Sequence, residues 1–179
     1  MGVHSKIKAI FLDRDGVLNN AVIIDEKPYP PKSINEIEIS EGVKEGLEQL
    51  KELGYLLIVI TNQPDIARGT TSMKTVDDIN NYLKQYLIID DFFCCVHDNI
   101  DNCECRKPKP GMIYSAVKKW NIDLHYSFMV GDRWRDIETG KNAGVKTILI
   151  DYGYKEKYVK PDYKCLNFTE VTQIIKSLT

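Results

Sequence analysis

The chain has 179 residues, of which 43% are apolar and 28% charged, so it fits one globular domain over residues 1–179 with a core of its own. Its formal net charge of −2 lacks the basic excess of a nucleic-acid-binding face, and no nucleic-acid partner is expected. No apolar stretch approaches the roughly 20 residues of a membrane helix, and the first residues lack a signal-peptide core, so we expect no membrane partner and a cytoplasmic location.

The first predicted strand is the apolar run 9–12, which leads into a charged turn that contains a glycine. Asp13 and Asp15 stand one residue apart in this turn. Their charges repel, and each carboxylate is costly to desolvate unless a cation or hydrogen-bond donors compensate it. A bound divalent cation supplies that compensation, whereas the plainer interpretation is a polar turn after a strand.

The segment 20–39 comes next and contains Pro28, Pro30 and Pro31 around Tyr29. Because proline removes a backbone donor and restricts the chain, a regular helix or a central strand is excluded here. We therefore expect an irregular loop, which either covers the site near Asp13 or forms an inert part of the surface.

Beyond this loop, helices and strands alternate along the chain. Together with the first strand, continuous apolar runs predict strands at 9–12, 55–60, 92–96, 128–130 and 145–150. Apolar stripes at helical spacing predict five helices. The first runs from an N-cap at Ser40 to Gly54, and the second begins at an N-cap at Ser72 with the stripe Met73, Val76, Ile79, Leu83 and Leu87. The third runs from Pro110 to Trp120, the fourth is short and ends at Gly144, and the last runs from an N-cap at Asn167 or Thr169 to Leu178. This alternation predicts a three-layer, Rossmann-like α/β fold with helices on both faces of a parallel sheet.

Polar residues follow the first, second and fourth predicted strands, and the carboxyl ends of parallel strands share one edge of a sheet. These residues are Asp13 and Asp15, the run Thr61-Asn62-Gln63, and Asp132 with Asp136. Carboxylates that leave coordination positions open suit Mg²⁺, and Lys107 is a cation that can neutralise an anionic substrate. With hydroxyl and amide donors nearby, these groups suit phosphoryl transfer, in which one carboxylate attacks and a second carboxyl protonates the leaving oxygen.

The chain resembles the haloacid dehalogenase (HAD) superfamily of phosphohydrolases over almost its whole length. The matching residues are Asp13-Arg14-Asp15-Gly16, Thr61-Asn62-Gln63, Lys107, Gly131-Asp132 and Asp136. The resemblance implies that Asp13 is the nucleophile, which forms an aspartyl-phosphate, and that Asp15 is the general acid and base. It also implies that Mg²⁺ is held by Asp13, the Asp15 carbonyl and Asp132, with Asp136 in support. The phosphoryl group would be held by Thr61 and Lys107, with Asn62 and Gln63 as further candidates.

Three cysteines and one histidine lie close together in the sequence, at Cys95, His97, Cys103 and Cys105. Such a set can form a closed tetrahedral zinc site, so the zinc would be structural and would shape a loop of about residues 95–105 that presents Arg106 and Lys107. Chance placement of core thiols is the alternative. The pattern resembles the zinc-loop subgroup of the superfamily, which includes phosphatases of heptose bisphosphate and of histidinol phosphate. The remaining candidates are expected to be buried thiols and surface histidines, namely Cys94, Cys165, His4 and His125.

The gaps after the first and third predicted strands leave no room for a separate cap domain, so we expect an open site screened by short loops. Arg106, Arg133 and Arg68 are cations that can reach a second anionic group, although a surface ion pair is the stronger expectation for Arg68. The resemblance then favours Mg²⁺-dependent removal of the 7-phosphate from a sugar bisphosphate such as D-glycero-D-manno-heptose 1,7-bisphosphate. The alternatives are a phosphatase of histidinol phosphate or another small phosphomonoester, a DNA 3′-phosphatase, and a catalytically idle, metal-stabilised binding module.

Two stretches depart from the heptose phosphatases of that subgroup. Pro64-Asp65 stands where Ser-Gly usually follows the Thr-Asn-Gln run, although Ile66–Gly69 then matches. The stretch Tyr29–Pro31 also lengthens the first loop. Both departures lie where we expect the substrate to be recognised.

Overall fold

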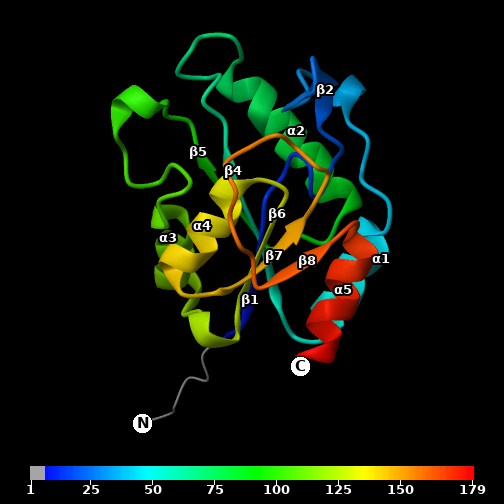
Figure 1. Cartoon of the computed structure of the whole chain (residues 1–179). Coiled ribbons are helices and arrows are strands. Elements are labelled where there is room, and N and C mark those ends of the chain that lie inside the picture. The colour runs from blue at the N-terminus through cyan, green and yellow to red at the C-terminus, as the bar shows by residue number, and fades with distance from the viewer. Residues whose placement is uncertain (1–6) are drawn as a thin grey trace.

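The structure is a computed structural model that describes residues 7–179 (Figure 1). Six strands form one parallel sheet in the order β5-β4-β1-β6-β7-β8. They are β1 (Ala9–Leu12), β4 (Leu56–Asn62), β5 (Asp91–Cys95), β6 (Phe128–Gly131), β7 (Lys146–Ile150) and β8 (Tyr163–Cys165). The predicted parallel sheet is confirmed. The edge strand β8 was not predicted, because three residues that include a lysine carry no apolar run.

Helices cover both faces of this sheet, as the alternation predicts (Figure 1). The helices are α1 (Val43–Glu52), α2 (Met73–Tyr86), α3 (Gly111–Trp120), α4 (Trp134–Ala143) and α5 (Phe168–Ser177), with short 3₁₀ turns η1 (Ile34–Glu36), η2 (Asn99–Asp101) and η3 (Leu124–Tyr126). Because alternate residues of a strand point to opposite faces, Ile10 and Leu12 pack with α1, α2 and α5, whereas Ala9 and Phe11 pack with α3 and α4. The three-layer α/β prediction is therefore correct.

Two of the predicted N-caps are present and one is wrong. The side chains of Ser72 and Asn167 accept backbone hydrogen bonds at the starts of α2 and α5. Ser40 does not cap α1, because its hydroxyl donates to the Asn20 side chain and the chain turns at Gly42 instead. Gly42 has a φ of +76°, and a β-carbon there would lie 2.4 Å from the Thr169 hydroxyl, so only glycine fits this start.

The segment 20–39 is more regular than the sequence predicts. It contains an antiparallel hairpin of β2 (Val22–Ile24) and β3 (Lys27–Tyr29), which is separate from the main sheet. The two residues at its tip, Asp25 and Glu26, both have positive φ angles, as a tight two-residue hairpin turn requires. The prolines exclude a central strand, as expected, but they tolerate this exposed two-stranded ribbon.

Several smaller predictions are also decided by the structure. Cys165 is buried and His125 is exposed, as expected, but Cys94 is only half-buried. Met73 is exposed and not part of the α2 core stripe. His4 lies outside the described residues. Among residues 7–179, each helix is too short or too polar to cross a bilayer.

Candidate active site

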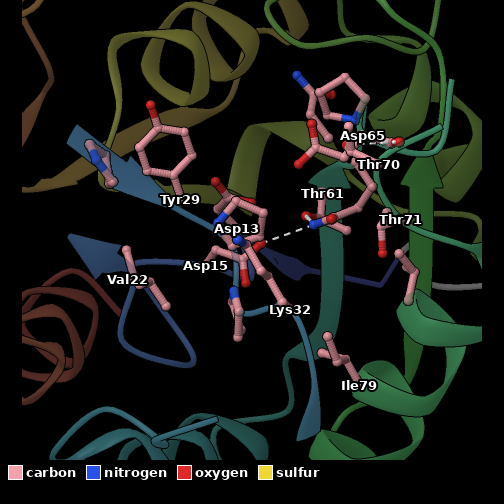
Figure 2. Close-up of a pocket in the computed structure, with 18 of the residues that line it drawn as sticks. Asp13, Asp15, Val22, Tyr29, Lys32, Thr61, Asp65, Thr70, Thr71 and Ile79 are labelled. Carbon is pink, nitrogen blue, oxygen red and sulfur yellow. Dashed lines mark hydrogen bonds between the residues drawn. The ribbon is translucent and has the colours of Figure 1, made fainter. Parts of the chain in front are cut away.

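The carboxyl ends of β1, β4 and β6 open into a cavity of about 990 Å³. Figure 2 shows Asp13, Asp15 and Thr61 on its floor, with Tyr29 and Val22 of the hairpin on one side and Ile79 of α2 on another. The cavity is lined by every residue that the sequence nominates for phosphoryl chemistry, namely Asp13, Asp15, Thr61, Asn62, Gln63, Arg106, Lys107, Asp132, Arg133 and Asp136. Residues far apart in the sequence therefore meet at one sheet edge.

Lys107 lies between two acids at the centre of the site. Its ammonium nitrogen is 2.8 Å from Asp13 Oδ1 and 2.7 Å from Asp136 Oδ1, and it also donates to the Ile60 carbonyl at 3.0 Å. The side chain is 3% exposed, and burial alone would lower its pKa. The carboxylates of Asp13 and Asp136 outweigh burial and raise the pKa of Lys107 above its ordinary value, so the cation is permanent.

Asp13, Asp132 and Asp136 are buried carboxylates whose oxygens lie within 4.8 Å of one another. Burial and the Asp136 carboxylate raise the pKa of Asp13 to about 7, even though Lys107 lowers it. Burial, followed by Asp136 and Asp13, raises the pKa of Asp132 well above its ordinary range. One ammonium group therefore does not balance three acids at neutral pH, and a bound cation would.

Asp132 also offers a ligand atom with no protein partner. Its Oδ1 is buried and accepts no hydrogen bond among the described residues. Gly16, with a φ of +87°, leaves the space in front of this carboxylate open, since a β-carbon there would lie 2.0 Å from Asp132 Oδ2. Oxygen-only ligands with open positions fit Mg²⁺. The residues present thus fit the divalent ion that the sequence predicts.

Asp15 is held by donors on both of its oxygens. Arg14 donates from Nε to Oδ1 at 3.1 Å and from Nη2 to Oδ2 at 3.0 Å. Asn19 Nδ2 reaches Oδ1 at 3.1 Å, and Gln63 Nε2 reaches Oδ2 at 2.9 Å. Gln63 also donates to the Thr61 hydroxyl, so the end of β4 is tied to Asp15.

Asn62 holds the backbone of Lys107 in place. The Asn62 side chain accepts from the Lys107 amide at 3.0 Å and donates to the Lys107 carbonyl at 3.2 Å. Both ends of the Asn62 amide are therefore occupied, which positions the Lys107 side chain over Asp13. A contact of Asn62 or Gln63 with a phosphoryl group stays a prediction.

The predicted zinc ligands come together beside this site. Cys105 Sγ lies 3.1 Å from Cys95 Sγ, 3.4 Å from Cys103 Sγ and 3.3 Å from His97 Nδ1. Cys95 and Cys103 are 3.7 Å apart. Zn–S bonds of about 2.3 Å in a tetrahedron put sulfur ligands about 3.8 Å apart, which the Cys95–Cys103 separation matches, whereas Cys105 would move outward by a few tenths of an ångström. With that shift the Cys₃His set fits one zinc ion without an open position.

The arginines at the cavity differ in how they are neutralised. Arg68 is paired with Asp98 and Asp65, as expected for a surface ion pair, and Arg133 is paired with Glu156. Arg106 is anchored to the zinc loop through the Asn99 side chain at 2.8 Å and the His97 carbonyl at 3.1 Å, with Asp98 at 3.8 Å.

Arg135 was not among the predicted site residues. It is half-buried, lines the cavity and stacks on Trp134 with 4.6 Å between the guanidinium carbon and the ring centre. It makes no ion pair among residues 7–179. Burial, and then the guanidinium groups of Arg106 and Arg133, lower the pKa of Arg135. An anion in the cavity would relieve this crowding of positive charge.

The comparisons with known proteins agree on one family. Residues 26–150 match the family model of haloacid dehalogenase-like hydrolases. A D-glycero-beta-D-manno-heptose-1,7-bisphosphate 7-phosphatase of Helicobacter pylori is 38% identical over 175 residues, which cover 94% of this chain and 98% of the relative. The chain belongs to the heptose-1,7-bisphosphate 7-phosphatase family of HAD-like hydrolases.

Other members of this heptose phosphatase family support the assignment. A D-glycero-alpha-D-manno-heptose-1,7-bisphosphate 7-phosphatase of Photorhabdus laumondii is 42% identical over 84% of this chain and 86% of the relative. A crystal structure of D,D-heptose 1,7-bisphosphate phosphatase from B. bronchiseptica, complexed with magnesium and phosphate, matches with a TM-score of 0.83 and 28% identity over 97% of this chain and 100% of that one. The relatives are thus named for both anomers of the sugar.

Both departures from the heptose phosphatase pattern lie on the cavity wall. Tyr29, Pro30 and Pro31 line it from the hairpin side, and Pro64 and Asp65 line it beyond the end of β4. Both stretches thus line the cavity, and their part in recognising the substrate stays a prediction. Arg14 Nη1 donates to Asn80 Oδ1 on α2 at 3.0 Å. Neither residue could be nominated from the sequence, because a charged residue in a turn and a polar residue on a helix are ordinary surface features.

Proposed function

We propose that this phosphatase removes the 7-phosphate of D-glycero-D-manno-heptose 1,7-bisphosphate, with Mg²⁺ as its metal and Asp13 as its nucleophile. The observation that carries the proposal is the cluster of Asp13, Lys107, Asp136 and Asp132 on the cavity floor. The names of relatives at 38% and 42% identity supply the substrate. Cations at the cavity rim suit a second phosphate on that substrate.

In the first step the Asp13 carboxylate attacks the phosphorus atom of the 7-phosphate. The bond between phosphorus and the sugar oxygen breaks, and Asp15, which has taken up a proton at the position that Gln63 Nε2 vacates, gives that proton to the sugar oxygen. Lys107 and the Thr61 hydroxyl hold the phosphoryl oxygens in line during transfer. Asp13, the Asp15 carbonyl and Asp132 would hold the Mg²⁺ ion, which neutralises phosphoryl charge when bound.

In the second step a water molecule attacks the phosphorus atom of the aspartyl-phosphate. Asp15, now ionised, takes the proton from this water, and the bond between Asp13 and phosphorus breaks. Inorganic phosphate is released, and Asp13 and Asp15 return to their starting states. Asp136 helps to keep Lys107 in contact with Asp13 throughout, because its carboxylate also accepts a hydrogen bond from the ammonium group.

A structural zinc ion is the second metal that we propose. Cys95, His97, Cys103 and Cys105 would hold it, and the ion would fix the loop from which Arg106 and Lys107 extend. Thiols this close together persist as metal ligands in a reducing compartment, which supports the expected cytoplasmic location.

The second phosphate of the substrate would lie between Arg106 and Arg135. Arg135→Gln should therefore raise the KM for heptose bisphosphate about 10- to 100-fold, the range of one lost charge-assisted hydrogen bond. Hydrolysis of p-nitrophenyl phosphate, which has one phosphate only, should change less than about twofold. Arg68→Gln is the matched control, because Asp98 and Asp65 already neutralise Arg68 at the same cavity. An equal loss on both substrates would contradict this second anion site.

A panel of phosphate esters tests the proposed substrate. The panel contains both anomers of heptose bisphosphate, histidinol phosphate, simple sugar phosphates, a 3′-phosphorylated DNA oligonucleotide and p-nitrophenyl phosphate. We expect the kcat/KM of one heptose bisphosphate anomer to exceed that of every other ester by at least about tenfold. One additional contact with the second phosphate is worth a factor of about this size. A higher kcat/KM for histidinol phosphate or for the DNA oligonucleotide would make that ester the substrate in place of heptose bisphosphate. No Mg²⁺-dependent turnover of any ester would leave the binding-module alternative.

A further inference from the structure

The buried guanidinium of Arg14 approaches Asp15 from the side away from the cavity. Arg14 is 0% exposed and is among the largest fully buried side chains of the protein. It does not line the cavity, whereas Asp15 does. Burying a guanidinium is costly unless its hydrogen bonds are well made. The two parallel contacts from Nε and Nη2 to the two oxygens of Asp15, at 3.1 and 3.0 Å, are such bonds and fix the plane of the carboxyl group.

Arg14 is itself held from two further directions. Its Nη1 donates to Asn80 Oδ1 on α2 at 3.0 Å, across 66 residues of sequence. Its backbone N–H donates to Asp13 Oδ1 at 2.7 Å. A planar guanidinium can bind Asp15 with one edge and Asn80 with the remaining nitrogen, which an ammonium group cannot do. Arg14 thus connects Asp13 and Asp15 to helix α2.

Helix α2 is also a wall of the substrate cavity. Thr75, Val76 and Ile79 of this helix line it, and Asn80 follows directly (Figure 2 shows Ile79 below Asp15). The orientation of Asp15 therefore depends on the same helix that the departing sugar would contact. Gln63 and Asn19 complete the set of donors from the other sides.

We propose that Arg14 is the positioning residue that aims Asp15 at the leaving oxygen, and that Asn80 on α2 braces Arg14 in that role. This inference rests on the proposed function of Asp15 as general acid. In the step concerned, the Asp15 proton passes to the ester oxygen while the phosphorus–oxygen bond breaks and the bond to Asp13 forms. Arg14 neither gains nor loses a proton and touches neither the substrate nor the metal.

The test compares a poor leaving group with a good one. An alcohol such as the sugar leaves only when its oxygen is protonated, whereas nitrophenolate leaves without a proton. Arg14→Lys keeps the positive charge but loses the paired hydrogen bonds to the two oxygens of Asp15. Asn80→Leu keeps the side-chain volume but loses the oxygen that accepts from Arg14. For heptose bisphosphate, kcat/KM should fall about 100-fold in Arg14→Lys and about tenfold in Asn80→Leu, with KM changed less than about threefold. For p-nitrophenyl phosphate, kcat/KM should fall less than about threefold in both variants.

Rapid mixing adds a second readout for the same variants. Because Asp15 also activates water in the second step, its misplacement should let the aspartyl-phosphate accumulate. Arg14→Lys with p-nitrophenyl phosphate should then release a burst of nitrophenolate that approaches one per chain, followed by a slow steady state.

Asn81→Leu is the matched control, because Asn81 is the exposed neighbour of Asn80 on α2 and should leave both substrates unaffected. Equal losses on the two substrates in Asn80→Leu would reduce Arg14 and Asn80 to a structural role and overturn the inference, as would unchanged rates on both. Should Arg14→Lys fail to fold, the Asn80→Leu result decides alone. A parent enzyme without Mg²⁺-dependent turnover would instead defeat the proposed function.

Discussion

Asp13→Asn is expected to lower kcat by at least about 10⁴-fold on every phosphate ester that the parent enzyme hydrolyses. The amide cannot attack phosphorus, and Asp15 cannot replace Asp13, because donors on both of its oxygens hold its carboxylate in place. Steady-state kinetics of the purified variant with p-nitrophenyl phosphate and excess Mg²⁺ measures this loss. The asparagine fills the same space, so circular dichroism and zinc content should match the parent.

The same substitution has a distinct signature in stability. The pKa of Asp13 is about 7 in the folded, metal-free protein, against an ordinary value of 3.8. Between about pH 4 and pH 7 the folded state thus holds a proton that the unfolded state has released, so the parent loses stability as the pH rises through this window. Asp13→Asn removes this loss. Without metal, the unfolding temperature of the variant minus that of the parent should therefore be larger at pH 8 than at pH 5.

Magnesium should reverse the order of the two proteins. A ligand that binds only the folded state stabilises it more when its affinity is higher. An asparagine amide is a weaker ligand for Mg²⁺ than a carboxylate, so the variant should bind the ion less tightly. Millimolar Mg²⁺ at pH 8 should raise the unfolding temperature of the parent more than that of Asp13→Asn. An active Asp13→Asn enzyme would rule out Asp13 as the nucleophile, whereas an equal response to Mg²⁺ would remove it from the metal site.

Cys105→Ser is expected to release the zinc ion and to disable the enzyme from outside the catalytic cluster. Cys105 is within 3.4 Å of Cys95, Cys103 and His97, so its loss opens the whole set. Metal binding contributes directly to the stability of such a loop, and several kcal/mol of unfolding free energy should be lost. Because Arg106 and Lys107 follow directly, a displacement of about 1 Å at Lys107 should reduce kcat/KM about 100-fold.

Elemental analysis and thermal unfolding check this result together. The parent, purified without added metal, should contain about one zinc per chain, and Cys105→Ser should contain almost none. Cys94→Ser is the control, since Cys94 precedes the first ligand but lies outside the cluster. It should keep its zinc and its activity. A zinc-free parent that is fully folded and active would show that the four residues do not serve as a metal site.

The order of the elements and the identity of the central groups were predictable from sequence because each depends on local pattern. Asp13 and Asp132 each follow a buried apolar run, and parallel strands end on the same edge, so their convergence follows from topology. The cluster of the three cysteines and the histidine was predictable for a similar reason, since these residues lie within one loop and their spacing alone limits the geometry.

The support around these groups was not predictable, because it depends on contacts between distant segments. In the sequence Arg14 is one more charged residue in a polar turn. In the structure it is fully buried, and its guanidinium donates to the side chain of Asn80 on α2, which lies 66 residues away in the sequence. Ser40 has the side chain of an N-cap, but its hydroxyl donates to Asn20, and α1 begins after Gly42, whose positive φ angle and closeness to Thr169 suit glycine. Local propensity favours such features without determining them.

The position of the arginines shows the same division between sequence and tertiary structure. The sequence by itself determined the family, the acids, the lysine and the loop with the cysteine and histidine cluster, because these follow from residue types at fixed spacing. Only the tertiary structure decided that Arg133 is neutralised by Glu156 while Arg135, two residues later, faces the cavity without a carboxylate partner among the described residues. Arg133 at the N-cap and Arg135 in the first turn of α4 point in different directions, and the surrounding chain sets which of them meets an acid.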